Sequence, residues 1–167
     1  MDKLMLNSVE VLVTIGLIYM MLKYWNRKLR TGYSIETGNK AFGIFISFQI
    51  VTILLVVVHG INPQNALYME GFSMFGKGAY DYWSIVGVQI VGFSLALILA
   101  NLMGHLLFMV GYQSEKGLYE EIKEDNLAAS LIASVLILTI GFVLSHFVLN
   151  PFIFEWISRN AAFIPLS

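Results

Sequence analysis

The sequence has no cysteine and few charged residues. Without cysteine, the chain can form neither disulfides nor thiolate metal sites, and cysteine usage does not indicate whether its compartment is oxidising or reducing. Asp, Glu, Lys and Arg make up 13% of the 167 residues, against about 25% in an ordinary soluble domain. The net charge is −1, so no basic field indicates a nucleic-acid partner. These deficits argue against a soluble domain and against nucleic-acid binding.

The sequence has long apolar stretches instead of charged residues. Hydrophobic residues make up 57% of the chain, and residues 41–69 and 84–114 carry no charged side chain. Apolar runs of about 18 residues or more are typical of membrane spans. The sequence thus predicts an all-α, polytopic membrane protein with one membrane domain over residues 1–167. The four expected transmembrane helices are Leu4–Trp25, retained rather than cleaved as a signal, and Ala41–Gly60, Trp83–Val110 and Leu127–Leu149. We expect a surface loop over 61–82 and an interfacial tail over 151–167.

Basic residues predict the orientation of these spans. Seven of the ten lie in the first and third connections, and only Lys3, Lys77 and Arg159 lie on the other side. Cytoplasmic loops are enriched in Lys and Arg. Both termini are therefore expected outside the cytoplasm. The charged loops 23–40 and 112–126 are expected inside it, where they offer a surface to a cytosolic protein.

An internal repeat relates the second and fourth spans. Asn39 corresponds to Asn126 and His59 to His146, both at a spacing of 87 residues. Matched polar residues at both ends of a span are harder to obtain by chance than matched Ile or Ala. We infer a tandem duplication of a two-helix unit, the first over about 1–63 and the second over about 80–151. Both copies enter from the same side, so the repeats are expected to be parallel.

A family resemblance rests on residues around these helix starts. They are Ile35, Gly38-Asn39 and Ala41; Asp81-Tyr82-Trp83 and Gln89; and Ile122, Glu124, Asn126, Ala128-Ala129 and Gly141. In these features the chain resembles the YjfL-like proteins, a bacterial inner-membrane family of unknown function. The resemblance implies architecture and a location in the bacterial inner membrane, and it transfers no catalytic residue. One departure is Asp125, where the resemblance implies glycine.

Small residues form ladders on two of the spans. They are Gly92, Ala96, Ala100 and Gly104 on the third, and Ala129, Ala133, Gly141 and Ser145 on the fourth. Such spacing presents a smooth stripe that lets another helix backbone approach closely. The stripes predict either helix packing within the chain or an interface between subunits of a homo-oligomer.

Polar residues inside the spans are candidates for function, because burying them in lipid is costly. They are Glu10, Gln49, Gln89, Asn101 and His105. The four deeper residues, Gln49 to His105, either form hydrogen bonds between helices or line a water-filled path. Glu10 either lies at the headgroup level, faces a polar cavity or pairs with a histidine.

The residues at the ends of the second and fourth spans allow further interpretations. His59 and His146 suit interfacial anchoring, a pH response or, more weakly, a metal site, for which two ligands are few. Asn39 and Asn126 suit caps at helix starts. The acidic turn Glu120–Asp125 suits the positive end of a helix dipole, surface ion pairs or a docking partner.

Three classes of function follow from these features. An oligomeric membrane scaffold or assembly component with cytosolic partners is the first, and a channel- or transporter-like oligomer is the alternative. A membrane enzyme is least favoured, because no nucleophile motif, carboxylate dyad or Gly-rich nucleotide fingerprint fits its context. We therefore expect no enzymatic activity and no cofactor, and the membrane lipids themselves are the one certain class of contact for such a chain.

Overall fold

A computed structural model describes the backbone of residues 2–36, 38–69, 72–73, 79–112, 116–160 and 162–163. Side chains are described for residues 8, 11–36, 38–59, 86–112 and 116–156. Within these ranges the chain is built almost wholly of helices, as its apolar runs predict.

The helices follow one another with short connections. α1 spans Asp2–Trp25 and passes into a wider π-helical turn, η1, over Asn26–Thr31. α2 spans Lys40–Met69 and α3 spans Ala79–Tyr112. The short α4 covers Leu118–Lys123. The last helical run consists of α5 (Leu127–Leu144), the π-helical turn η2 (Ser145–Leu149) and α6 (Asn150–Asn160).

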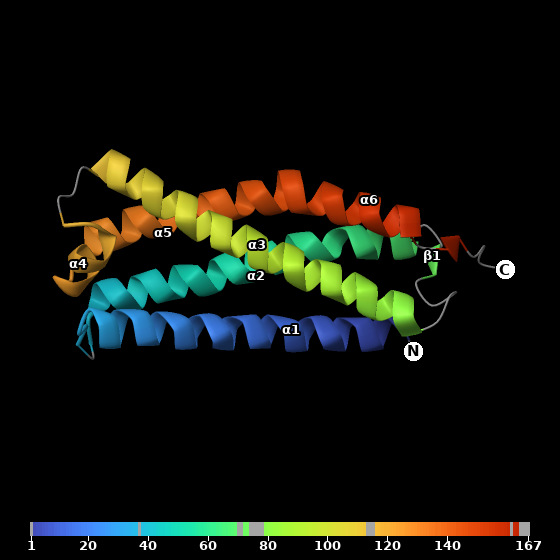
Figure 1. Cartoon of the computed structure of the whole chain (residues 1–167), viewed down its shortest axis with the longest axis horizontal. Coiled ribbons are helices and arrows are strands. Elements are labelled where there is room, and N and C mark those ends of the chain that lie inside the picture. Colours follow the sequence, from blue (N-terminus) through green and yellow to red (C-terminus); the bar gives the residue numbers. More distant parts are fainter. Residues whose placement is uncertain are drawn as a thin grey trace.

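The long helices lie side by side along one axis, with α3 crossing the others obliquely (Figure 1). α1 begins and α6 ends at the same end of this bundle, while α4 lies at the opposite end (Figure 1). Two-residue strands, β1 (Phe72–Ser73) and β2 (Ala162–Phe163), pair antiparallel and join the α2–α3 connection to the segment after α6. The bundle therefore has one terminal end and one connector end.

Three helical runs in the described part of the chain are long and apolar enough to cross a membrane: Lys40–His59, Val86–Tyr112 and Leu127–Trp156. Their outward faces are apolar, with Val110 77% exposed and Ile98 62% exposed. Such large exposed apolar faces suit contact with lipid tails, which are themselves apolar. The chain is therefore an all-helical membrane protein.

The helices extend beyond two of the expected span boundaries. Residues 61–69 continue α2, and α3 begins at Ala79, so most of the segment 61–82 is helical. The segment after Pro151 begins as α6, which continues the α5–η2 run and buries Ile153 completely. Proline removes one backbone donor and crowds the preceding turn. At Pro151 the helix continues directly after the wider turn of η2, and one missing hydrogen bond does not end it.

The small-residue stripes are buried within the chain. A Cβ added to Gly104 would lie 2.5 Å from Ile137 Cγ1 and 3.1 Å from the Ile137 backbone. On α5, a Cβ at Gly141 would lie 2.7 Å from Thr52 Cγ2 of α2. Ala100 and Ala133 are fully buried. The stripes let α2, α3 and α5 approach closely, so they give no evidence for an interface between subunits.

The other members of both ladders are likewise buried or lie against a neighbouring helical segment. Ala96, Ala129 and Ser145 are buried, and a Cβ at Gly92 would meet Leu149 Cδ1 at 2.5 Å. Of the two interpretations of the ladders, the geometry agrees with packing inside one chain.

Candidate functional site

The connector end is held together by hydrogen bonds from the two helix-start asparagines. Asn39 Oδ1 accepts the N–H of Phe42 at 2.6 Å, and Asn126 Oδ1 accepts the N–H of Ala129 at 3.1 Å. Each therefore caps the helix that it starts. The amide of Asn39 also donates to the carbonyl of Ile122 at 2.7 Å, across the two halves of the chain. The caps thus fasten the residue 116–126 segment, here called the α4 connector, to α2.

Asp125 strengthens this attachment. Its backbone has φ +58°, as Gly38 has φ +105° just before the other capping asparagine. Asp tolerates this left-handed conformation better than most residues, and a glycine there would leave no side chain. The carboxylate Oδ1 accepts the N–H of Ala41 at 2.7 Å, and Ser130 Oγ donates to the Ala41 carbonyl at 2.6 Å. The departure from glycine therefore supplies an extra bond to the first turn of α2.

Two acidic residues of the α4 connector, Glu120 and Glu124, form ion pairs within the connector itself. Lys116 Nζ lies 2.7 Å from Glu124 Oε1, and Lys123 Nζ lies 3.5 Å from Glu120 Oε2. The first contact raises the pKa of Lys116 through its hydrogen bond to the Glu124 carboxylate. Both pairs are about half exposed, so each stabilises the fold little. The α4 connector is thus firmly held by its backbone and charged on its outer surface.

Inside the bundle, two of the intramembrane polar residues pair with each other. Gln49 is 1% exposed and donates from Nε2 to Asn101 Oδ1 at 2.8 Å. Asn101 donates in turn to the carbonyl of Leu97 at 2.9 Å. Gln89 is also buried, whereas the side chain of Glu10 lies outside the described residues. The Gln49–Asn101 pair links α2 to α3, which is the hydrogen-bonding role expected of such residues.

His59 and His146 lie beside each other towards the terminal end. The ring centroids of His59 and His146 are 5.4 Å apart, and the Phe142 ring stacks on His146 at 5.7 Å. Among the described residues, no group of three potential His, Cys, Asp or Glu ligands gathers anywhere. His59 and His146 therefore form an aromatic contact between α2 and η2.

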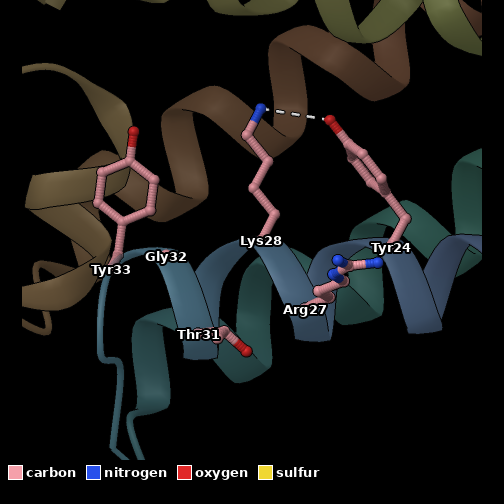
Figure 2. Close-up of a pocket in the computed structure, with 6 residues that line it drawn as sticks. All are labelled: Tyr24, Arg27, Lys28, Thr31, Gly32 and Tyr33. Atoms are coloured by element: carbon pink, nitrogen blue, oxygen red, sulfur yellow. Dashed lines mark hydrogen bonds between the residues drawn. The ribbon is translucent and has the colours of Figure 1, made fainter.

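A different set of residues forms the most distinctive polar site, at the connector end of α1. Lys28 in η1 donates to Tyr24 Oη and to Tyr119 Oη, both at 3.3 Å (Figure 2 shows the Tyr24 bond). Its Nζ also lies 4.6 Å from the Tyr119 ring centroid and 5.4 Å from the Trp25 ring. Aromatic faces attract a nearby ammonium. The His105 ring also stacks on Tyr119, with the ring centroids 5.1 Å apart.

This aromatic surrounding changes how Lys28 and Tyr119 ionise. Burial acts to lower the pKa of Lys28, but its hydrogen bonds to Tyr119 and Tyr24 outweigh burial and raise the pKa above its usual value. Burial raises the pKa of Tyr119, and Lys28 only partly opposes this. Near neutral pH the site therefore holds a protonated Lys28 beside the neutral phenol of Tyr119.

Lys28 stands where two hollows meet. A groove of about 550 Å³ lies between α1 and α3, and its lining is mainly apolar away from the Lys28 end. We call it the α1–α3 groove. Its polar lining comprises Lys28, Tyr24, Tyr119, Asn101 and His105, together with Ser94. A second hollow of about 530 Å³ shares Tyr24 and Lys28 and adds Arg27, Thr31, Gly32 and Tyr33 (Figure 2).

Sequence reasoning singled out Asn101 and His105 but not the residues around Lys28. Lys28 served only as evidence for orientation, and Tyr24 and Trp25 only as markers of a span end. The missed signal was their spacing, because a lysine three and four residues after two aromatics can turn back over their rings on a helix. Tyr119 is 91 positions away and carried no local signal at all.

Comparison with known families adds one result. Residues 4–148 match the family described as a Domain of Unknown Function, DUF350. No curated protein and no solved structure matches the chain. Because the family model covers most of the sequence, the chain belongs to the DUF350 family.

Proposed function

We propose that this DUF350 protein is a four-span, non-enzymatic scaffold of the bacterial inner membrane that recruits a cytosolic partner through its connector end. One observation carries the proposal: the α4 connector is attached to the start of α2 by two hydrogen bonds of 2.7 Å, while the side chains of its ion pairs are about half exposed. A loop that served only as a tether would not need such attachment. A rigid charged surface is suited to recognising a partner.

α1 is the proposed fourth span. It has 24 residues, about 36 Å at 1.5 Å per residue, and lies beside α2 along the bundle (Figure 1). The excess of Lys and Arg near the connector end favours that end as cytoplasmic. The capping of α2 and α5 by Asn39 and Asn126, each after a residue with positive φ, supports the tandem duplication. The resemblance to the YjfL-like proteins supports the inner-membrane location.

Single cysteines test the topology cleanly, because the chain has none of its own. We expect a membrane-impermeant maleimide to label Glu155→Cys on intact spheroplasts, and Lys123→Cys only after lysis. Ser8→Cys should behave like Glu155→Cys, since α1 starts at the terminal end (Figure 1). Labelling of Ser8→Cys together with Lys123→Cys would remove α1 as a span.

Photo-crosslinking in cells tests the scaffold. A photoreactive residue at position 123 should crosslink to a soluble protein, and one at the lipid-facing position 110 should not. Reversing two charges with Glu120→Lys and Glu124→Lys should abolish the crosslink. The matched control, Lys116→Glu with Glu124→Lys, exchanges the members of one ion pair without changing the charge of the connector, and should preserve it. Crosslinks that survive the double reversal would contradict recognition by charge.

A channel-like homo-oligomer is the second candidate, because Asn101 and His105 line the α1–α3 groove. Its first test is the mass of the protein in lipid nanodiscs. An assembly of about four or more subunits is large enough to form a shared pore, and its conductance should then change in Asn101→Leu. A monomer or compact dimer excludes a central pore and leaves the scaffold.

A further inference from the structure

The α1–α3 groove has the length of one membrane leaflet. Along α1 its lining extends from Leu17 to Lys28, about 16 Å at 1.5 Å per residue. Half of a hydrocarbon core of about 30 Å is about 15 Å. The groove thus runs from the depth of the membrane midplane to the headgroup level at the connector end.

Its chemistry changes along that length. The deep part is walled by Leu17, Met20 and Met21 of α1 and by Leu97 and Ile98 of α3. Met20 is 59% exposed and Ile98 62% exposed, so the groove opens sideways towards the lipid. Methionine is flexible and fills irregular apolar contacts. The shallow end is polar, with Lys28, Tyr24 and Tyr119.

Lys28 brings a positive charge to that shallow end. Among the described residues, the groups that raise its pKa are the phenols of Tyr119 and Tyr24, which are not carboxylates. An ammonium has three donors, and the phenols of Tyr24 and Tyr119 accept two. Arg27 lines the adjoining hollow. Basic pockets between transmembrane helices at the cytoplasmic side are suited to anionic lipid headgroups.

We propose that the α1–α3 groove binds an anionic membrane phospholipid, with its phosphate at Lys28 and one acyl chain between α1 and α3. A second copy of the chain fits less well. The α3 sequence has no Asp or Glu between Ser84 and Ser114, so the lipid-facing part of this helix in another copy offers no anion at this depth. The proposal is independent of the cytosolic partner, because it uses only α1, η1, α3 and Tyr119.

Native mass spectrometry of the full chain with phosphatidylglycerol tests the headgroup end, and phosphatidylethanolamine with the same acyl chains is the reference lipid. The chain should retain phosphatidylglycerol preferentially, and Lys28→Gln should weaken that retention about tenfold, as expected for one charge-assisted bond. Lys23→Gln is the matched control. It removes the same charge within two turns of the same helix, but Lys23 lines a different hollow beside Phe42 and Ile46. Equal losses in the two variants would overturn the site in favour of general surface charge.

The apolar end is tested separately by filling it. Ile98→Trp should reduce retention of phosphatidylglycerol, whereas Val91→Trp, equally exposed on α3 outside the groove, should not. Both positions face outward, so neither substitution should unfold the protein, which the melting temperature checks. Retention unaffected by Ile98→Trp would overturn the acyl-chain placement. Displacement of the lipid by inorganic phosphate would overturn the proposal in favour of a soluble anion. A dimer that dissociates in Ile98→Trp and not in Val91→Trp would overturn it in favour of a second copy of the chain.

Discussion

The close approach of α3 to α5 at Gly104 makes a sharp prediction about stability. In Gly104→Ala the new methyl group would lie 2.5 Å from Ile137 Cγ1 and 3.1 Å from the Ile137 N and Cα. A side chain can rotate away, but the backbone can move only if the two helices separate. Overpacking of this kind costs about 1–3 kcal/mol. The better helix propensity of alanine returns up to about 1 kcal/mol, so we expect a net loss of about 1–2 kcal/mol.

The control lies on the same helix. Gly87 has no atom within 4 Å of an added Cβ, so Gly87→Ala should be neutral or stabilise by up to about 1 kcal/mol. Unfolding in mixed micelles, followed by tryptophan fluorescence to which the buried Trp25 contributes, measures both variants on one scale. Ile137→Ala should cost less in the Gly104→Ala background than in the natural sequence, because it removes the nearest clashing atom. Equal stability of Gly104→Ala and Gly87→Ala would refute the close approach.

Three further predictions concern the polar contacts. Asp125→Ala should lower the free energy of unfolding by about 1–2 kcal/mol, because it removes the hydrogen bond to the first turn of α2. Asp125→Gly should lower it less, because glycine adopts the φ of +58° without strain. Equal losses in the two variants, measured by unfolding in micelles, would contradict a contribution from the backbone conformation at this position. In the folded protein the pKa of Lys28 is raised above 10.5 and that of Tyr119 above 10.0, so the stability that these groups give the fold is complete below about pH 10 and is lost as the pH rises through the raised values. This loss of stability at alkaline pH should be smaller in Tyr119→Phe. A profile of melting temperature against pH that is the same in this variant would contradict the prediction. Gln49→Leu should destabilise more than the double variant with Asn101→Leu, because the single change leaves the part-buried amide oxygen of Asn101 without its donor. Thermal melts showing additive losses would rule out the pairing.

The helix starts show how far local sequence reaches. A capping asparagine binds an N–H three residues later in its own chain, so the roles of Asn39 and Asn126 depend on neighbours that the sequence displays. The boundaries after Gly60 and at Pro151 were less predictable. Proline and glycine lower helix stability by a few kcal/mol at most, and helix packing can outweigh that amount.

The candidate site shows the opposite case. Lys28, Tyr24 and Trp25 are local, but the site also needs Tyr119 of α4 and His105 of α3, which only the packing of the bundle brings to them. The same holds for Gln49 and Asn101, 52 positions apart. Their polarity marked them as candidates, and nothing in the sequence said that they would pair with each other.

The sequence by itself determined that this chain is a helical membrane protein and where α2 and α5 begin, because apolar length and capping chemistry act over a few neighbouring residues. Only the tertiary structure decided that the small-residue stripes are buried within one chain and that a lysine ends a groove between α1 and α3. The reason is physical: which face of an apolar helix meets another helix depends on shape complementarity between surfaces, and in lipid all those faces are almost equally apolar.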